Sequence, residues 1–433
     1  SEGLATTLAT EREAFAKYES SKALFFRNGV PVVAGDTIKN LDLAYTLEQI
    51  AAKGADGFYK GDVAKKWIDD IHAKGNAMKL SDLARYYAPE REAVSGTYRG
   101  YTLWSSAPPV SGGAELVARM NLLEQFPKPV NYTNDVATLN AALSAWFLVP
   151  STRNRVADPG LWAVDIEPIV NRDTARVRWG CFNAEKALRP ADVRGDTLAC
   201  LKAAAKAATS SGTPFARTES RCGDDHALEV TVCRSSGTTA FTVADNEGNV
   251  VAVTQTLGTW GGNFYVAPGL GFLSNDKLTS YGTDPTQYGS RLPFARHGST
   301  LAPTIVFKGR KPVFAVGAAG NAWITSAVYQ SLIGALDFGM NPQQALELPR
   351  FLPGGGGPPG TGGAPASYNI QMEDGFSPDV IKALRAMGFG VSFVSLRGEL
   401  REGYGAAVSI DGKNVMAGAD PRRAGAAGAV PNK

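Results

Sequence analysis

The chain has 433 residues, with 44 Lys and Arg against 41 Asp and Glu, and a formal net charge of +3. So small a charge predicts no binding to nucleic acid or to an anionic membrane surface. Hydrophobic residues at 44% and charged residues at 20% are typical of globular proteins, and no stretch approaches the roughly 18 unbroken apolar residues of a membrane-spanning helix.

About the first two hundred residues are predicted to be mainly helical. Residues 38–59 and 61–76 carry apolar residues three and four positions apart and contain Gly near their ends, as amphipathic helices do. Residues 95–126 are predicted to form a strand, a loop with the sequence SSAPPVSGG, and a helix, and we expect this loop to wall a pocket. The N-terminal residues SEGLATTLATEREAF contain no signal peptide, although a removed signal would leave no trace.

The four cysteines, Cys181, Cys200, Cys222 and Cys233, are clustered in the middle of the chain. Their spacing fits no C-x-x-C pattern, so we expect no zinc site. Two disulfides are predicted, with Cys181–Cys200 and Cys222–Cys233 the simplest of three possible pairings, and four reduced, buried thiols are the alternative. If the cysteines are bridged, the protein matured in an oxidising compartment.

From Thr238 onward the pattern changes to β-hairpins. Three segments each contain two runs in which apolar residues alternate with others, joined by a short turn sequence. They are residues 238–258 with the turn DNEGN, residues 299–320 with KGRK, and residues 403–421 with DGK. Residues 321–339 and 377–389 are predicted helices that frame these hairpins. Hairpins and helices in this order favour a layered α+β fold over a doubly wound parallel sheet.

A threonine is the candidate catalytic group. None of the three histidines, His72, His226 and His297, lies in a pattern that points to a partner, and no G-x-S-x-G or H-E-x-x-H sequence occurs. A Thr hydroxyl is a poor nucleophile without a base, which its own α-amine supplies if Thr becomes N-terminal. Gly237 before Thr238 suits such a junction because Gly permits strain and close approach, although Gly-Thr-Thr at the start of a strand is by itself usually structural.

Several motifs then occur in an order that identifies a family. TTAFTVADNEGNVVAVTQTLG, PGLGFLSND, GSTLAPTIV, VGAAGNAWITSAVYQ and GADPR together resemble the catalytic subunit of γ-glutamyltransferases, which are N-terminal-nucleophile hydrolases. FYKGDVAKKW and EREAVSGTYRGYTLWSSAPPVSGG resemble the large subunit of the same family. The resemblance implies a four-layer αββα sandwich and a precursor that cuts itself into residues 1–237, the large-subunit-like scaffold, and residues 238–433, the catalytic region, within one intertwined domain. Members of this family carry a further N-terminal segment before the part that matches SKALFFRNG, and the resemblance implies that this segment is missing from this chain.

The resemblance assigns catalytic roles. Thr238 matches the nucleophile of self-cleavage and turnover, and Thr256 matches the Thr that supports its amine and side chain. Thr239 matches the second Thr of the family's pair. Gly320 and Asn321 fall at the two positions whose backbone N–H groups form the oxyanion hole, and each donor contributes roughly 3 kcal/mol in the transition state.

Other residues are assigned to substrate binding. Arg91 matches the Arg that grips the substrate α-carboxylate, for which a planar guanidinium is suited, and Ser299 and Thr300 match a hydroxyl pair at the same group. In the family a set of three residues holds the substrate α-amine. Asn275 matches one residue of this set, and Asp276 could substitute for one of the other two. Lys277 and Ser280 stand where the other two members of that set are expected, and Gly258 stands in place of an expected Asn.

The sequence therefore predicts a self-cleaving threonine amidohydrolase and acyltransferase for γ-glutamyl amides such as glutathione, with water or an amino-acid or peptide amine as acceptor. An acylase for glutaryl-type side chains without an α-amine is one alternative, since Lys277 disfavours an ammonium group. An uncut, non-enzymatic binding protein is the other. We expect no metal or organic cofactor, no nucleic-acid or membrane partner, association of the two cleavage fragments, and a periplasmic or secreted location.

Overall fold

The computed structural model divides the chain into two compact units. It describes residues 1–152, 155–194, 197–202, 236–354, 368–393, 403–412, 414–423 and 425–430. The smaller unit consists of Ser1–Arg91 and Thr256–Lys277, and the larger unit of Glu92–Gln255 and Leu278–Lys433. Each unit thus contains residues from both sides of the predicted cleavage point after residue 237. Whether the chain is cut there stays a prediction.

The smaller unit is mainly helical, as predicted. Its elements are α1 (Glu2–Thr10), α2 (Arg12–Ala16), α3 (Glu19–Phe25), β1 (Phe26–Arg27), β2 (Val30–Pro31), α4 (Leu41–Lys53), α5 (Asp56–Tyr59), α6 (Gly61–His72) and α7 (Leu80–Ala84). Helix α4 begins where the Asn40 side chain accepts a hydrogen bond from the Leu43 N–H at 2.9 Å, and it ends at Gly54.

The second segment of the smaller unit is built into its interior. The Ser21 hydroxyl donates to the Phe264 carbonyl and the Thr46 hydroxyl to the Leu270 carbonyl, each over 2.8 Å. The Phe264 ring packs edge-on against Phe15, with centroids 5.1 Å apart. These buried contacts make residues 256–277 part of the core of this unit.

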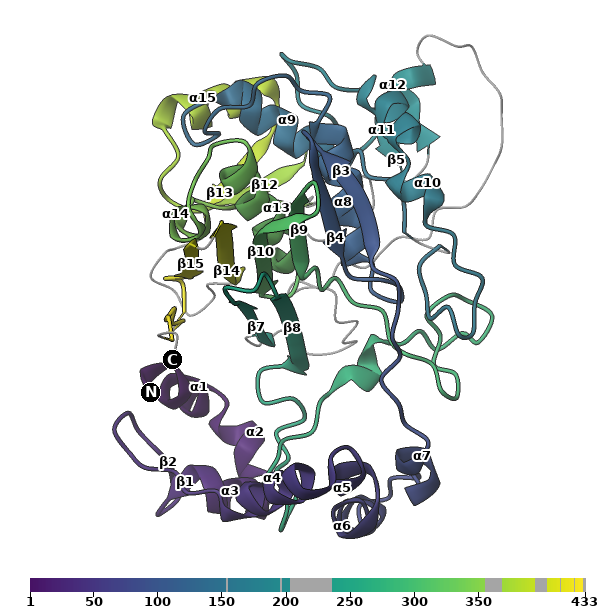
Figure 1. Cartoon of the computed structure of the whole chain (residues 1–433), viewed down its shortest axis with the longest axis vertical. Coiled ribbons are helices and arrows are strands. Elements are labelled where there is room, and N and C mark those ends of the chain that lie inside the picture. The colour runs from purple at the N-terminus through teal and green to yellow at the C-terminus, as the bar shows by residue number, and fades with distance from the viewer. Residues whose placement is uncertain are drawn as a thin grey trace. The chain divides into compact units, whose positions relative to one another are not determined.

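The larger unit is organised around a six-stranded antiparallel sheet. Its strand order is β15-β14-β10-β9-β4-β3 (Figure 1), in which the strands are β3 (Val94–Tyr98), β4 (Tyr101–Ser105), β9 (Thr304–Lys308), β10 (Lys311–Ala319), β14 (Tyr404–Asp411) and β15 (Asn414–Ala419). The β9–β10 and β14–β15 hairpins are those predicted from KGRK and DGK. Residues 95–105, expected as one strand, form the β3–β4 hairpin instead, because Arg99 and Gly100 take left-handed conformations and close a tight turn.

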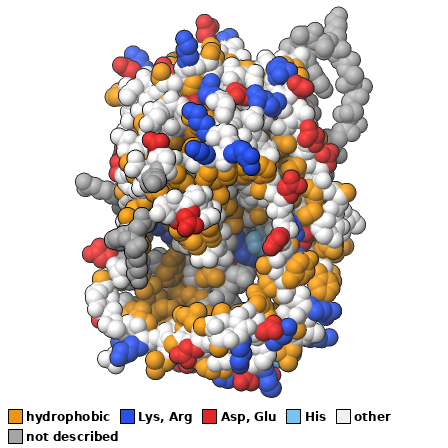
Figure 2. All heavy atoms as spheres, in the orientation of Figure 1, with side chains coloured by type: hydrophobic (Ala, Val, Ile, Leu, Met, Phe, Trp, Pro, Cys, Tyr) orange, Lys and Arg blue, Asp and Glu red, His pale blue; other side chains and the backbone are white. Residues whose placement is uncertain are grey.

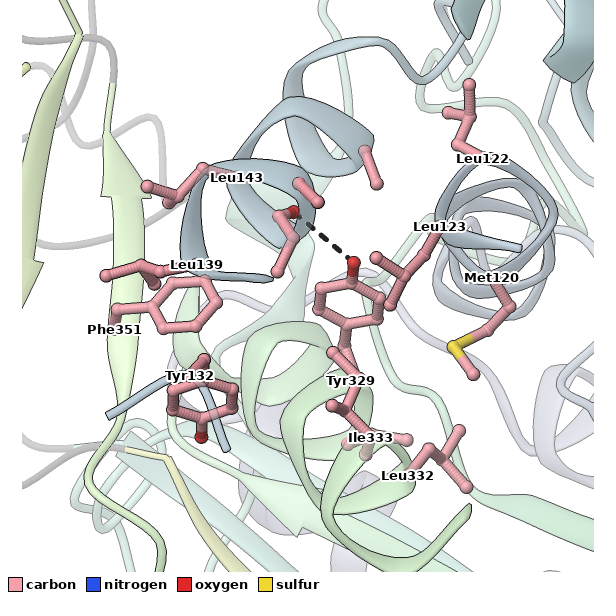
Figure 3. Packing of buried hydrophobic residues seen from close by; sticks show 14 of the residues in the cluster. Met120, Leu122, Leu123, Tyr132, Leu139, Leu143, Tyr329, Leu332, Ile333 and Phe351 are labelled. Atoms are coloured by element: carbon pink, nitrogen blue, oxygen red, sulfur yellow. Dashed lines mark hydrogen bonds between the residues drawn. The ribbon is translucent and has the colours of Figure 1, made fainter. Parts of the chain in front are cut away.

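Helices cover one face of this sheet and form the main core. Helices α8 (Gly112–Leu123), α9 (Val136–Phe147) and α13 (Trp323–Leu336) contribute apolar side chains that meet Val316 and Ala318 of β10. Figure 3 shows Tyr329 of α13 between α8 and α9, with its hydroxyl donating to the Ala142 carbonyl over 3.3 Å. The polar tip of this buried ring is therefore satisfied.

A two-stranded ribbon packs against the other face. It is the predicted hairpin of β7 (Ser236–Ala244) and β8 (Val250–Thr259), and it lies next to β10 and β14 in Figure 1. Gly317 of β10 approaches the ribbon so closely that a Cβ there would lie 3.3 Å from Ala240 and 3.2 Å from Thr254. The described residues thus show a helical layer, a sheet and a ribbon. The α+β class is confirmed, and the four-layer sandwich stays a prediction.

The remaining elements surround this framework. They are α10 (Glu167–Val170), α11 (Arg172–Trp179), β5 (Val193–Arg194), β6 (Thr197–Leu198), α12 (Ala199–Lys202), η1 (Lys277–Ser280), α14 (Pro342–Glu347), β11 (Phe351–Gly354), β12 (Asn369–Met372), α15 (Pro378–Met387) and β13 (Gly390–Phe393). A disulfide joins Cys181 to Cys200, with Cα atoms 5.5 Å apart, which is the first of the two simplest pairs. The predicted Cys222–Cys233 pair lies outside the described residues.

The surface carries charges of both signs. On the face drawn in Figure 2, basic and acidic side chains are both spread among neutral areas, in keeping with the net charge of +3. Within the part of the chain that the structure describes, no helix has both the length and the hydropathy of a membrane span.

Candidate active site

The predicted nucleophile lies on the inward face of β7. Side chains alternate along a strand, and those of Thr238 and Ala240 point to the six-stranded sheet while Thr239 and Phe241 are exposed. Thr238 is only 5% exposed. Strand β7 begins at Ser236, so the predicted scissile bond between Gly237 and Thr238 lies within it. The structure therefore separates the two threonines, placing Thr239 on the opposite face from Thr238.

A tyrosine that sequence reasoning missed is bonded to the backbone of the predicted nucleophile. The Tyr404 hydroxyl donates a hydrogen bond to the backbone carbonyl of Thr238. Tyr404 begins β14, where it pairs with Ala319, the last residue of β10. Thr238 is thus linked to the end of β10, immediately before the predicted oxyanion hole.

Gly320 and Asn321 form the turn between β10 and α13. Both have positive φ angles, +122° for Gly320 and +48° for Asn321. The first hydrogen bond of the following helix runs from the Trp323 N–H to the Gly320 carbonyl over 2.9 Å. The N–H groups of Gly320 and Asn321 precede this helical ladder at the positive end of the helix dipole, which suits an oxyanion. Asn is among the few residues that tolerate a left-handed backbone.

The predicted hydroxyl pair is anchored beside the same turn. The Thr325 hydroxyl, in the first turn of α13, donates to the Thr300 carbonyl over 3.1 Å. The Ser299 carbonyl accepts the Ser111 N–H at 2.8 Å. These bonds hold Ser299 and Thr300 between the predicted SSAPPVSGG loop and the start of α13. The larger unit therefore brings Thr238, the turn at Gly320 and the Ser299–Thr300 pair to one region, the β10–α13 junction.

The other candidate residues belong to the smaller unit. The Thr256 hydroxyl oxygen accepts the Gly258 N–H at 2.8 Å, which orients this side chain. The Asp276 carboxylate accepts the Thr259 N–H at 3.2 Å and so binds the end of β8. Gly258 has φ +96°, and a Cβ there would overlap the carboxylate of Asp276, with its Cγ only 2.9 Å away. The exchange of the expected Asn for Gly258 thus has a steric reason.

The remaining substrate-binding candidates are exposed or only half-buried. Asn275 is exposed, and its side-chain oxygen accepts the Lys277 N–H at 2.9 Å. Lys277 is half-buried and its Cε would lie 3.3 Å from a Cβ on Gly258. Arg91 is half-buried and is the last residue of the first segment of the smaller unit.

A buried ionic cluster supports the region around Tyr404. Arg350 pairs with Asp420 over 2.7 Å, and Arg422 pairs with Asp420 over 3.1 Å and with Glu373. Burial opposes ionisation of Asp420, but the two guanidinium groups hold the pKa of that carboxyl below its ordinary value. Asp420 also accepts the Gly405 N–H at 2.9 Å and so fixes the residue after Tyr404. Asp420 and Arg422 belong to the motif GADPR, but the sequence did not predict the cluster.

The candidate site is made of hydroxyl and backbone groups. Over the described ranges, no group of three or more His, Cys, Asp or Glu side chains is placed so that it could hold a metal ion. Acyl transfer needs a nucleophilic hydroxyl and N–H donors for the oxyanion, and Thr238 and the turn at Gly320 and Asn321 are the candidates for these two parts.

Comparison with known proteins gives a consistent picture. A model of the family described as gamma-glutamyltranspeptidase matches residues 1–430. Over 429 residues the chain is 30% identical to the glutathione hydrolase proenzyme of Escherichia coli (strain K12), a match that covers 95% of this chain and 65% of that protein. It is 27% identical over 372 residues to the acylase ACY 1 proenzyme of Pseudomonas sp. (strain SE83), covering 85% of this chain and 58% of that one.

A solved structure supports the fold. The crystal structure of cephalosporin acylase from Bacillus halodurans is similar with a TM-score of 0.77 over 99% of this chain and 70% of that chain, at 21% identity. At this identity the likeness concerns the fold. The chain spans less than two thirds of the length of the two curated relatives above.

Proposed function

This chain belongs to the gamma-glutamyltranspeptidase family, and we propose that it is a self-cleaving threonine amidohydrolase and acyltransferase acting on γ-glutamyl amides. The observation that carries the proposal is the position of Thr238. It is buried on the inward face of β7, and Tyr404 links its carbonyl to the strand end that leads into the left-handed turn at Gly320 and Asn321.

Maturation is the first reaction in this proposal. The Thr238 hydroxyl oxygen attacks the Gly237 carbonyl carbon, the peptide C–N bond breaks, and the nitrogen keeps its electron pair and gains a proton. This step already frees the amine of Thr238. Water then opens the ester between Gly237 and the Thr238 hydroxyl oxygen, which gives fragments 1–237 and 238–433 and restores the hydroxyl. An α-amine titrates near pH 8, so an appreciable fraction is an unprotonated base at neutral pH.

Turnover uses the same residue. The amine of Thr238 accepts the hydroxyl proton while the oxygen attacks the substrate amide, and the N–H groups of Gly320 and Asn321 stabilise the oxyanion. The tetrahedral intermediate expels the leaving amine, which takes up the proton, and an acyl ester remains on Thr238. Water or the amine of an amino acid or peptide then attacks this ester and releases the product.

The substrate class follows from the flanking residues. We assign the α-carboxylate of a γ-glutamyl group, as in glutathione, to Arg91, Ser299 and Thr300, and its α-amine to Asn275 and Asp276. The disulfide between Cys181 and Cys200 favours maturation in an oxidising compartment, so we propose a periplasmic or secreted location. No metal, organic cofactor, nucleic acid or membrane has a part in this proposal.

A second candidate is an acylase for side chains that lack the α-amine, such as glutaryl. Lys277 lies against Gly258, and the Asp276 carboxylate already binds the Thr259 N–H, so this region offers a cation where an ammonium group would need an anion. The ratio of kcat/KM for a γ-glutamyl anilide and a glutaryl anilide separates the two. A strong preference for the glutamyl compound defeats the acylase.

Self-cleavage tests the proposal directly. Purified protein should convert from a 45.7 kDa band to two fragments, and N-terminal sequencing of the smaller fragment should begin at Thr238. Thr238→Ala should stay intact and inactive, whereas Thr242→Ala, on the same strand and face, should be cut. A wild-type protein that stays intact and inactive under these conditions would instead be a non-enzymatic relative with a binding role.

A further inference from the structure

Tyr404 lies between a cation and the backbone of the proposed nucleophile. Its hydroxyl donates to the Thr238 carbonyl, and Arg423 Nη1 donates to the same hydroxyl oxygen over 3.2 Å. The Arg423 guanidinium also lies over the Tyr404 ring, 4.2 Å from its centroid. The three groups form one chain of hydrogen bonds that runs from Arg423 through Tyr404 to Thr238.

The backbone on both sides of Tyr404 is held tightly. Gly403 has φ +81°, and a Cβ there would lie 2.9 Å from the Cβ of Trp323, the first residue of α13. Gly405 donates its N–H to Asp420 over 2.9 Å and packs under the Gly317 carbonyl. Tyr404 therefore has a fixed position relative to α13 and to its partner Ala319 in β10.

From this geometry we propose that Tyr404, oriented and polarised by Arg423, is a positioning residue that holds Thr238 against the turn at Gly320. The inference deepens the proposed function and rests on Thr238 being its nucleophile. Tyr404 contacts the carbonyl of Thr238 and not the reacting atoms, so its effect reaches the reaction through the backbone of that residue.

The need for such an anchor follows from what cleavage does to Thr238. Before the cut, Gly237 holds the residue on its N-terminal side; after the cut, Thr238 is a chain end, and chain ends are mobile unless they are tied down. Its carbonyl oxygen lies two bonds from the amine-bearing Cα, so a hydrogen bond to that oxygen restricts both the amine and the hydroxyl. Arg423 strengthens the tether because a phenol that accepts a bond from a cation becomes a better donor.

The expected loss is in rate rather than in affinity. Removing one hydrogen bond of this kind changes a rate by about tenfold, and displacement of a reacting group by a fraction of an ångström adds to this. Tyr404→Phe keeps the ring beneath Arg423 and removes the hydroxyl. It should slow the appearance of the fragment that begins at Thr238 and lower kcat about tenfold, with KM within twofold of wild type.

A matched control separates positioning from stability. Tyr98 lies in the same sheet and its hydroxyl donates to Asp337 over 2.6 Å, away from Thr238 and the β10–α13 junction. Tyr98→Phe should lower the melting temperature but leave the cleavage rate and the kcat of the folded, cleaved protein unchanged. For each variant, kcat is referred to the concentration of cleaved protein, and melting curves report stability.

Arg423 variants test whether Arg423 acts on Thr238 through the Tyr404 hydroxyl. Arg423→Gln should lower kcat about threefold when Tyr404 is present. In a protein that already carries Tyr404→Phe, the same change should not lower kcat further, because Arg423 acts through the hydroxyl that is missing there. The inference is overturned if Tyr404→Phe cleaves and turns over as fast as Tyr98→Phe, if it raises KM at unchanged kcat, or if the two changes add fully. Failure of wild type to cleave would overturn the proposed function itself, which distinguishes the two.

Discussion

The carboxylate of Asp276 occupies the space that a side chain at Gly258 would fill. Gly258 has φ +96°, and its N–H is bonded to the Thr256 hydroxyl oxygen, so the glycine, the carboxylate and the catalytic candidate Thr256 form one compact arrangement in the smaller unit. Gly258 is therefore required at this position by its neighbours, and the Asn expected from the family would not fit beside Asp276.

We expect Gly258→Ala to disturb this arrangement. The new Cβ must displace Asp276 or the end of β8, at a cost of about 1–3 kcal/mol in the free energy of unfolding, and kcat should fall with the movement of Thr256. The control is Gly248→Ala, since Gly248 has a similar φ of +91° with no atom within 4 Å of an added Cβ. Urea unfolding and kcat measure both effects. Equal losses in the two variants would show that backbone strain alone is responsible.

The turn at Gly320 and Asn321 should respond very differently to two alanine substitutions. Asn321→Ala keeps the backbone N–H and costs about 1 kcal/mol of strain, so kcat should change by no more than about threefold. Gly320→Ala cannot keep φ +122° and should rotate the peptide that carries an oxyanion donor, which lowers kcat roughly a hundredfold. The rates are measured with a γ-glutamyl anilide on cleaved protein.

Gly339→Ala is the control for this pair, because Gly339 has φ +66° and open space at the far end of α13. It should lose stability and keep kcat. If Gly320→Ala kept wild-type kcat as well, the oxyanion role of this turn would be wrong.

The buried cluster at Asp420 should make stability depend on pH. Its pKa is lower in the folded protein than its ordinary value of 3.8, so the unfolded chain takes up the proton first as the pH falls. The stabilisation is complete above that ordinary value and is lost as the pH falls below it. Asp420→Asn should lower the free energy of unfolding by about 3–5 kcal/mol at neutral pH, since two buried guanidinium groups lose a partner. It should also make the free energy of unfolding depend less on pH in the acid range.

Urea unfolding between about pH 6 and pH 3 measures this dependence. Asp374→Asn serves as the control because Asp374 is an exposed carboxylate next to Glu373 of the cluster. If the free energy of unfolding of Asp420→Asn changed with pH as steeply as that of wild type, groups other than Asp420 would be responsible for the acid sensitivity.

The disulfide between Cys181 and Cys200 should contribute measurably to stability. It closes a loop with a sequence separation of 19, for which restriction of the unfolded chain predicts about 3 kcal/mol. The double variant Cys181→Ser and Cys200→Ser should melt at a lower temperature than wild type. Dithiothreitol should lower the melting temperature of wild type more than that of the double variant, and equal shifts would contradict the assignment.

The sequence predicts the hairpins well because their signals are local. DNEGN, KGRK and DGK lie between alternating runs, and the structure has strands on both sides of each. The β3–β4 hairpin was missed because its turn, Arg99 and Gly100, lacks the usual Asn-Gly or Asp-Gly pair. The inward position of Thr238 and the outward position of Thr239 follow from simple alternation.

The anchors of the candidate site were not predictable in the same way. The Tyr404 hydroxyl bonds to a carbonyl 166 positions away, and no local pattern marks a tyrosine for such a role. The glycines on both sides of it indicate only a close approach. In the sequence, Arg350 and Glu373 likewise cannot be told from ordinary surface charges. Their burial depends on Asp420 and Arg422, which come much later in the chain.

The composition of the two units has a consequence for the protein after cleavage. Fragments 1–237 and 238–433 would each contribute to the smaller unit, through contacts such as Ser21 with Phe264, and to the larger unit, through the pairing of β4 with β9. Separation of the fragments would break a core and a sheet, so dissociation and unfolding would be one process. A cut protein of this kind is a heterodimer whose thermal stability rises with its concentration, whereas that of the uncut chain does not.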